Sequence, residues 1–374
     1  MTLVAMPEPS PPLPSIDPPR APTLDSVARH AGVSRQTVSN ALNNPSVVRP
    51  ETLQRVRAAI EVLGYRPSAA ARNLRTRRSR TIAMRLHPIR DGVKGMVHDR
   101  FVHAVVEAAR EHDHRVLLIP LARRADETAA FADAVARGEA DAALLTAVER
   151  DDPRQAELVR QRVPFVSFGR HWGTTGCGPW VDIDGAAGTY QATQHLLRCG
   201  HTRIGFLGWP RGSRVGDDRR AGWASALADA SVPADPRHEL EVVDNTDHAR
   251  YAVEAVLQLD TPPTALVCAS DTLALGALQT AGLRAAHAAA EIAIVGFDDT
   301  PTAATVGLTS VAQPLPEAAR ASVRLLIALI EGHASAHDEQ VLIEPRLVPR
   351  ASTLRHVDEQ GRPRGVGLGR VNWR

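Results

Sequence analysis

The stretch 32-GVSRQTVSNALNN-44 carries hydroxyl and amide side chains on one side of a short helical pattern and apolar residues on the other. Val33, Val38 and Leu42 form the apolar side. A helix that only packs against its own protein does not need so many donors and acceptors on its outer face. The pattern therefore predicts a helix with one buried face and one face that lies against a partner rich in hydrogen-bonding groups.

Two further helical patterns flank this stretch. Thr23 is suited to cap the first, whose buried residues would be Leu24, Val27, Ala28 and Ala31. Gly32 provides the turn, and Ser34 caps the second helix. The third begins at Pro50–Glu51, ends at Gly64 and carries Leu53, Val56, Ile60 and Leu63 at spacings of three and four. Two helices joined by a tight glycine turn, with a third to close the core, predict a helix-turn-helix module over residues 22–66.

In such a module the start of the second helix points into the major groove of DNA. Arg35 can grip guanine O6 and N7, Gln36 can do the same for adenine N6 and N7, and Asn40 could reach a further base. Short polar side chains suited to phosphate oxygens are Thr23, Ser39, Asn43 and Thr52. From composition alone, a polar helix face against water remains an alternative.

The distribution of charge supports a polyanionic partner. Residues 1–80 hold 12 Arg and 5 Asp or Glu, a balance of +7, whereas the remainder holds 32 basic and 37 acidic residues, a balance of −5. A basic head on a mildly acidic body favours nucleic acid, and a solvated basic tail is the alternative. We find no apolar run long enough for a membrane span and no secretory signal. Three cysteines without metal-like spacing fit a reducing cytoplasm, and we expect no cofactor, metal or membrane partner.

After the headpiece the pattern changes to alternating strands and helices. Residues 1–21 are Pro-rich and predict a disordered extension. Strands are expected at "TIAMRL", "RVLLIPL", "DAALLT" and "PFVSFG", with a helix such as 101–112 between them, and then at "RIGFLG", "LEVVD", "TALVCAS" and "EIAIVGFDD". Two such series predict two α/β lobes within residues 81–356, with a ligand cleft between them.

These motifs together resemble the lactose-repressor (LacI/GalR) family. The resemblance rests on "TLDSVARHAGVSRQTVSNALNN" and "YRPSAAARNLR" in the headpiece and hinge, and on "VDIDGAAGTYQATQHLLRCGHTRIGFLG", "DDRRAGWASAL", "PTALVCASDTLALGAL", "IAIVGFDD" and "PRLVPRAST" in the body. It runs from about residue 22 to residue 354. It implies a homodimeric transcription factor, usually a repressor, that binds a palindromic operator in double-stranded DNA. Its two-lobed core would be similar to periplasmic sugar-binding proteins.

The resemblance also implies a hinge helix at Ser68–Arg75, within a linker over residues 67–80. Leu74 matches a leucine that wedges between base pairs at the operator centre, and Ala71 packs beside it. An apolar wedge in the minor groove unstacks a base step and bends the duplex. A lone leucine on a short helix is normally a core residue, but an Ala-rich helix beside "RTRRSR" has no obvious core to join.

Matched motif by motif, the effector site would include Arg219, Ser270, Asp271 and Asp298, with Arg170 as a weaker candidate. A guanidinium fork and a carboxylate suit the vicinal hydroxyls of a sugar. Two alternatives stay open: Asp298–Asp299 as a structural strand end, and Asp271 as a helix cap. Leu315 stands where an aromatic ring often stacks on the sugar, and an aromatic wall could come instead from Trp172, Trp180 and Trp209.

Two other classes of protein fit the sequence poorly. An enzyme is disfavoured because we see no P-loop, nucleophile elbow or HExxH motif, and because His112 and His114 are expected to be solvated. A solute-binding protein for transport would need a secretory signal and has no use for residues 22–75. The tail, residues 357–374, is rich in Gly and lacks heptads, so we expect it to be disordered and the protein to be a dimer rather than a tetramer. We expect the bacterial cytoplasm, with the protein on the nucleoid.

Overall fold

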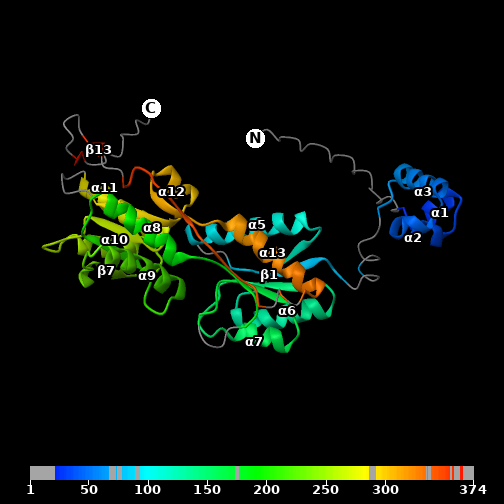
Figure 1. The fold of residues 1–374 in the computed structure, drawn as a ribbon, viewed down its shortest axis with the longest axis horizontal. Coiled ribbons are helices and arrows are strands. Elements are labelled where there is room, and N and C mark those ends of the chain that lie inside the picture. Colours follow the sequence, from blue (N-terminus) through cyan, green and yellow to red (C-terminus); the bar gives the residue numbers. More distant parts are fainter. Residues whose placement is uncertain are drawn as a thin grey trace, which may run out of the picture. The chain divides into compact units, whose positions relative to one another are not determined.

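The computed structural model describes residues 22–66, 73, 78–88, 93–172, 177–285, 292–333, 335, 338–353, 356–357 and 363–364. The chain divides into two compact units, Met1–Arg77 and Arg78–Arg374, and each is described by itself (Figure 1). The predicted extension 1–21 and the hinge positions Ala71 and Leu74 lie outside the described residues.

The headpiece consists of three α-helices and one short 3-10 turn. They are α1 (Leu24–Ala31), α2 (Arg35–Asn43), η1 (Pro45–Val47) and α3 (Pro50–Leu63). Thr23 and Ser26 form a capping box at α1, and the Ser34 hydroxyl accepts from the Thr37 amide at 3.1 Å. The predicted module is therefore confirmed, with its caps at the predicted residues.

A small apolar core holds these helices together. It contains Val27, Ala28, Ala31, Val38, Ala41, Val56, Ala59 and Tyr65. Arg55 of α3 donates to the carbonyl oxygens of Ala31 and Gly32, the latter at 3.0 Å. Gly32 has a φ of 62°, which only glycine adopts without strain. The turn between α1 and α2 is thus fixed from both sides, and it sets the direction of the second helix.

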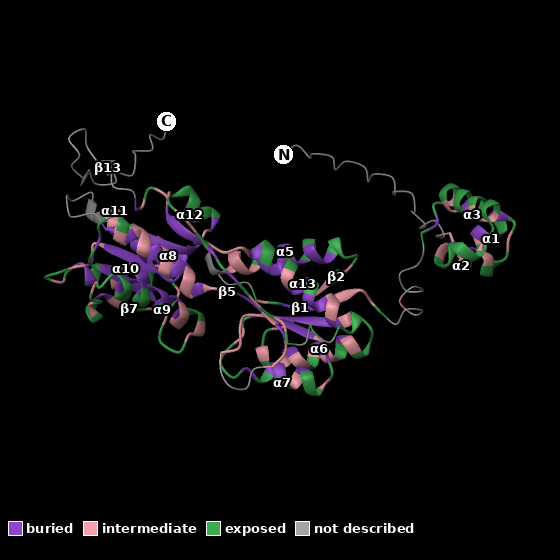
Figure 2. Cartoon of the chain, in the orientation of Figure 1, coloured by how far each residue is buried: buried purple, intermediate pink, exposed green. Residues whose placement is uncertain are grey.

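The larger unit contains two six-stranded sheets, each buried between helices (Figure 2). The first sheet is wholly parallel, in the order β11-β5-β4-β3-β1-β2. Its strands are β1 (Thr81–Leu86), β2 (Arg115–Pro120), β3 (Ala142–Leu145), β4 (Phe165–Phe168), β5 (Trp180–Ile183) and β11 (Gln340–Ile343). Helices α5 (Val93–Glu111) and α13 (Leu315–Glu331) pack on one face, and α6 (Glu127–Ala136) and α7 (Pro153–Arg160) pack on the other.

The second sheet has the order β12-β10-β9-β8-β6-β7, and β12 alone runs antiparallel to its neighbour. Its strands are β6 (Ile204–Gly208), β7 (Glu239–Glu241), β8 (Ala265–Cys268), β9 (Ala293–Asp298), β10 (Thr309–Ala312) and β12 (Arg346–Val348). Its helices are α8 (Gly185–Arg198), α9 (Arg214–Asp229), α10 (Thr246–Val256), α11 (Asp271–Ala285) and α12 (Pro301–Thr305). Short 3-10 turns are η2 (Arg124–Asp126) and η3 (Pro236–His238). The fold class is the predicted one, a helix-turn-helix headpiece with a two-lobed α/β core.

The two predicted series of strands had suggested that each lobe is one continuous segment. In the structure, the chain crosses between the lobes more than once. The chain leaves the first lobe after β5, returns to it at α13 and β11, and ends in the second lobe with β12. Sequence reasoning found eight strands but missed β5, β10, β11 and β12, and it began the helix at 101 instead of Val93. These strands have three or four residues each, and β11 and β12 lie at sheet edges where no continuous apolar run is required.

At the end of the chain, β13 (His356–Val357) pairs antiparallel with β14 (Pro363–Arg364). β13 begins just before the predicted disordered tail and β14 lies within it, while residues 358–362 and 365–374 lie outside the described part of the chain.

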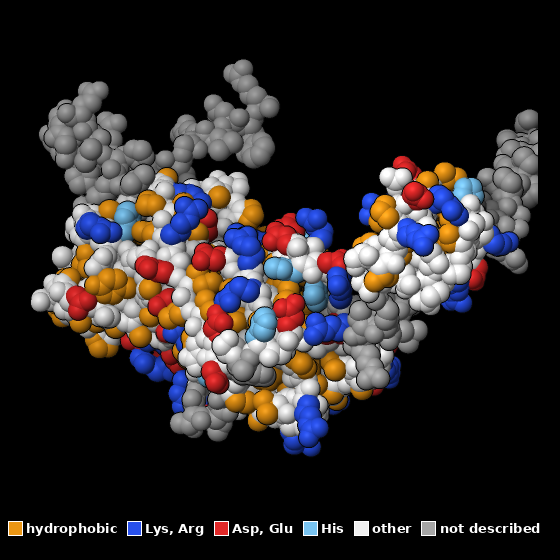
Figure 3. Space-filling view, turned by 45° about the vertical axis from the view of Figure 1, so that its right-hand side comes forward, with side chains coloured by type: hydrophobic (Ala, Val, Ile, Leu, Met, Phe, Trp, Pro, Cys, Tyr) orange, Lys and Arg blue, Asp and Glu red, His pale blue; other side chains and the backbone are white. Residues whose placement is uncertain are grey.

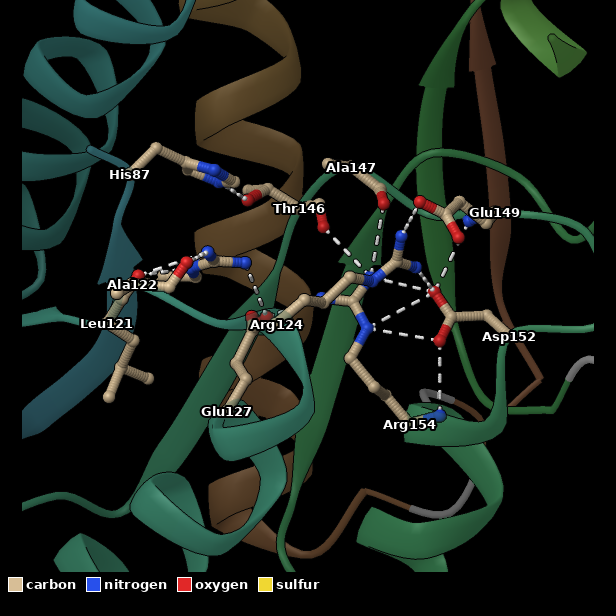
Figure 4. A network of polar contacts seen from close by, with 11 residues as sticks. His87, Leu121, Ala122, Arg124, Glu127, Thr146, Ala147, Glu149, Asp152 and Arg154 are labelled. Atoms are coloured by element: carbon tan, nitrogen blue, oxygen red, sulfur yellow. Dashed lines mark hydrogen bonds and ion pairs between the residues drawn. The ribbon is translucent and has the colours of Figure 1, made fainter. Parts of the chain in front are cut away.

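Buried ion pairs fix the loops at the carboxyl edge of the first sheet (Figure 4). Arg154 of α7 is 5% exposed and donates to Glu127 at 2.6 Å, to Asp152 at 2.7 Å and to the carbonyl oxygen of Thr146 at 3.0 Å. Glu127 is fully buried, and burial raises the pKa of its carboxyl group. Arg85 lies 3.7 Å from Glu127 and adds a second positive charge. The network therefore ties β1, α6, α7 and the loop after β3 into one unit.

We predict that Arg154→Ala lowers the free energy of unfolding of the core by about 3–5 kcal/mol, because it leaves two buried carboxylates with one partner fewer. Chemical denaturation of the full chain measures this change. Arg160→Ala is the matched control, since Arg160 pairs with Glu157 on the exposed side of the same helix. Equal stabilities of the two variants would contradict this role of the network.

Candidate functional site

The outer face of the headpiece presents the predicted base-reading residues. Arg35 is the first residue of α2, its side chain is 70% exposed, and its Nε lies 3.8 Å from Oδ1 of Asp25. The neighbouring Gln36 is also exposed and donates from Nε2 to Oδ1 of Asn40 at 3.0 Å. Arg35 and Asp25 border an open depression of about 620 Å³ between α1 and the start of α2. The face thus carries donors and acceptors that engage one another and water.

Two of the predicted phosphate contacts, Thr23 and Thr52, lie at helix starts, whereas Ser39 lies in the middle of α2 and Asn43 is its last residue. Thr23 caps α1, and Thr52 lies in the first turn of α3. The amide of Asn43 donates to the carbonyl oxygen of Ser39 at 2.7 Å at the end of α2. Helix starts offer unpaired backbone amides and a positive dipole end, both of which attract phosphate. On the face of the core drawn in Figure 3, Lys and Arg side chains are mixed with Asp and Glu side chains, so this face shows no purely basic surface for phosphates.

The predicted effector residues gather at the carboxyl ends of β8 and β9. Arg219 comes from α9 and is only 7% exposed. Its Nη1 donates to the carbonyl oxygen of Ala269, directly after β8, and lies 3.7 Å from Oδ1 of Asp298, the last residue of β9. The guanidinium lies over the ring of Phe297, 3.6 Å from its centroid. Arg219 and Asp298 are thus brought together as predicted.

Asp298 is held in an unusual environment. It is buried, its φ is 118°, and Oδ1 accepts from Nε2 of Gln313 at 2.6 Å. Burial raises the pKa of Asp298 to about 7, although the Arg219 charge acts in the opposite direction. Sequence reasoning missed Gln313 and Phe297, because their contacts with this site come from strand pairing between β9 and β10 and from helix packing.

The polar atoms of Ser270 and Asp271 are engaged within the protein, and their role toward the effector stays a prediction. Asp271 is fully buried, and its two carboxylate oxygens accept from the Thr300 amide at 2.7 Å, the Thr300 hydroxyl at 2.9 Å and the Ser310 hydroxyl at 2.6 Å. The Ser270 hydroxyl donates to Asp244 at 2.7 Å and accepts from the Leu273 amide, so it caps α11. The carboxylate contacts of Asp271 go to Thr300 and Ser310, so the alternative left open for Asp271, a helix cap, is filled instead by Ser270.

Arg170 joins the two lobes. It follows β4 in the first lobe, and its Nε donates to Asp182 of β5 at 2.7 Å. Its Nη2 donates to Asp218 of α9, in the second lobe, at 3.2 Å. Arg100 of α5 makes a second connection, donating to the carbonyl oxygen of Asp299 at 3.1 Å. Asp182 and Asp218 occur in motifs quoted for the resemblance, but only the folded chain identifies them as partners of Arg170.

The three tryptophans suggested for an aromatic wall lie in different surroundings. The ring of Trp209 has its centroid 5.4 Å from the guanidinium carbon of Arg219, and the ring of Trp172 lies 4.7 Å from that of Arg170. Trp180 instead packs edge-on against His171. Leu315 is buried in the core between α13 and the first sheet.

Among the described residues, no group of three or more His, Cys, Asp or Glu side chains could hold a metal ion. No helix in the described ranges is long and apolar enough to cross a membrane.

The chain has a helix-turn-helix headpiece with an exposed Arg-Gln pair and a two-lobed core with a buried polar cluster. This combination is typical of DNA-binding regulators with a ligand-binding core. Comparison with known proteins identifies the family. The model for "Bacterial regulatory proteins, lacI family" matches residues 23–68, and that for "Periplasmic binding protein-like domain" matches residues 193–353. The chain belongs to the lacI family, whose members are DNA-binding transcriptional regulators and not enzymes.

Individual relatives agree over nearly the whole chain. The HTH-type transcriptional regulator AglR of Rhizobium meliloti (strain 1021) is 33% identical over 339 residues, which are 88% of this chain and 94% of AglR. The lac repressor dimer bound to operator and the anti-inducer ONPF matches with a TM-score of 0.73 at 25% identity, over 90% of this chain and 100% of that one. The CelR–cellobiose complex matches with a TM-score of 0.63 at 30% identity, over 88% and 99% of the two chains.

The raised pKa of Asp298 predicts a pH-dependent effect on stability. The usual pKa of aspartate is about 3.9. Between this pH and about pH 7 the folded state binds more protons than the unfolded state, so ionisation of Asp298 lowers the free energy of unfolding as the pH rises. Asp298→Asn removes this ionisation. We therefore expect the melting temperature of Asp298→Asn relative to the unsubstituted protein to increase from pH 5 to pH 8. Asp133→Asn, at an exposed site on α6, is the control, and a difference that is flat or falls with pH would contradict the prediction.

Proposed function

We propose that this regulator is a homodimeric repressor that reads a near-palindromic operator with α2 and releases or tightens its hold when a sugar binds the core. The observation that carries the first part is the exposure of Arg35 and Gln36 at the start of α2, a helix whose direction is set by the Ser34 cap and by Arg55. These two side chains and Asn40 would read bases in the major groove. Backbone phosphates would be bound by Thr23, Ser39, Asn43 and Thr52.

The dimer follows from the geometry of recognition. One headpiece covers one half-site, so a palindrome needs two chains. We assign residues 22–66 to DNA reading, 67–80 to the hinge and 81–356 to effector binding and dimerisation. Leu74, with Ala71 beside it, would wedge into the central base step from each chain and bend the duplex. The lac repressor dimer bound to operator, a structure that matches nearly the whole chain, supports this arrangement.

For the effector we propose contacts from Arg219 and Asp298, with Arg170 positioned beside them. Their separation and burial give a guanidinium and a carboxylate within one small region, which suits adjacent hydroxyl groups. The CelR–cellobiose complex supports a sugar as the ligand. Ser270 and Asp271 stay predicted contacts, although their polar atoms are engaged within the protein. We further propose that the protein acts in the bacterial cytoplasm, on the nucleoid.

The test begins by selecting the preferred site from random duplex DNA with the full-length protein. We expect a near-palindromic sequence. Arg35→Ala and Gln36→Ala should each weaken binding to that site by about 1–3 kcal/mol while leaving binding to random DNA nearly unchanged, because each removes contacts to base edges. Fluorescence anisotropy at fixed salt concentration measures both affinities.

Arg57→Ala is the charge-matched control, since it removes one exposed arginine from α3 and should leave the ratio of specific to random binding unchanged. If Arg35→Ala and Gln36→Ala weakened both kinds of DNA equally, these residues would contact phosphates, and α2 would not read the sequence as proposed.

A further inference from the structure

The surroundings of Arg219 are strongly acidic. Burial lowers the pKa of Arg219, and four carboxylates, those of Asp298, Asp244, Asp218 and Asp182, lie close enough to act against this effect. Arg170 is the other cation of the cluster, and it is already shared between Asp182 and Asp218. Two guanidinium groups therefore share the cluster with four carboxyl groups. Asp184 near Asp218 and Asp271 near Asp298 are further carboxyl groups in these surroundings.

Several nitrogen atoms that could hold an anion are occupied by the protein itself. The Nε and Nη2 atoms of Arg170, which form the bidentate edge suited to a phosphate, are bound to carboxylates. Nη1 of Arg219 is directed at the Ala269 carbonyl oxygen and Asp298. A bound phosphate or carboxylate would have to displace these partners.

Two helix starts near the cluster, those of α8 and α11, are occupied in the same way. At the beginning of α8 the Ala186 amide donates to Asp218 at 3.1 Å, and the Ala187 amide donates to Asp184 at 2.9 Å. At α11 the Ser270 hydroxyl accepts the Leu273 amide. Amides at a helix start are the usual backbone site for a phosphate. Here carboxylates fill that role at α8, so an incoming anion would meet negative charge instead of free amides.

One donor in the cluster lacks a protein partner. Among the described residues, nothing accepts a hydrogen bond from Nε of Arg219, although this atom is buried and the side chain is only 7% exposed. A single N–H donor matches a hydroxyl or ring oxygen, and the neighbouring carboxylates accept hydroxyl hydrogens. The Trp209 ring near Arg219 offers an apolar surface for the face of a sugar ring.

We propose that the effector is an uncharged polyhydroxyl compound, a free sugar or polyol, and that the acidic cluster around Arg219 excludes sugar phosphates and sugar acids. This inference rests on the proposed function and narrows the ligand of the same site. It follows from the excess of carboxyl groups over guanidinium groups, from the engagement of Arg170 and of the start of α8, and from the buried Nε of Arg219 without a protein partner.

The experiment compares uncharged and charged members of matched pairs on the full-length protein. The probes are glucose with glucose 6-phosphate and with gluconate, fructose with fructose 1-phosphate, ribose with ribose 5-phosphate, and cellobiose with cellobionate. Thermal shift measures binding without DNA, and anisotropy measures affinity for the selected operator. We expect at least one uncharged member to raise the melting temperature and to change operator affinity at least fivefold, while its charged counterpart at equal concentration does neither.

A variant tests the cause of the exclusion. Asp218→Asn removes one negative charge and weakens the hold of this position on Nη2 of Arg170, so the preference for the uncharged member should fall at least tenfold. Asp229→Asn, an exposed position on the same helix, should leave the preference unchanged. Stronger binding of any charged member to the unsubstituted protein, or no binding by any uncharged member, would overturn the inference. An unchanged preference in Asp218→Asn would also overturn it.

Operator binding without ligand tests the proposed function separately. A chain that binds its operator and responds to a sugar phosphate would keep the proposed function and lose this inference. A chain without a preferred DNA sequence would lose the proposed function, while the thermal shifts would still decide the charge of the ligand.

Discussion

The second lobe is built around the buried guanidinium of Arg219. A charge removed from water costs several kcal/mol unless it is paired, and the chain meets this requirement from several elements at once. The carbonyl oxygen after β8, the carboxylate that ends β9 and the Phe297 ring all lie against it. Gly222 permits the approach of α9 to α8 that brings Arg219 there, because a Cβ at this position would lie 2.0 Å from the Ala186 carbonyl oxygen. The geometry of the acidic cluster around Arg219 therefore reflects the need to pair the buried guanidinium charge.

This cluster also connects the lobes. Asp218, the residue before Arg219, binds both Arg170 of the first lobe and the Ala186 amide where the chain crosses between lobes. Arg78, at the start of the core, donates to the Ile330 carbonyl oxygen near the end of α13 at 2.9 Å. Arg219 thus directly follows a residue that forms an interlobe ion pair.

Local rules were sufficient for the headpiece and insufficient for the site. Thr23, Ser34 and Gly32 act within a few residues of their own position, so the sequence predicts the three helices and their ends. The pairing of β11 with β5 joins segments far apart in the chain, and no short pattern encodes it. Motifs identified Arg219 and Asp298, but the partners Gln313, Asp182 and Asp218 depend on the fold. The contacts of Asp271 with Thr300 and Ser310 could not be predicted, because a structural carboxylate and a ligand carboxylate have the same sequence appearance.

We propose that DNA is read by the headpiece and the ligand is bound by the core, and that Arg219 couples the two. The most direct test measures the operator affinity of the unsubstituted protein and of Arg219→Ala, each with and without an uncharged sugar. The sugar is one that shifts the melting temperature of the unsubstituted protein, and it is added at a saturating concentration. The account predicts equal affinities, within about twofold, in the absence of sugar, and a response to sugar that only the unsubstituted protein retains. A full response in Arg219→Ala would contradict it.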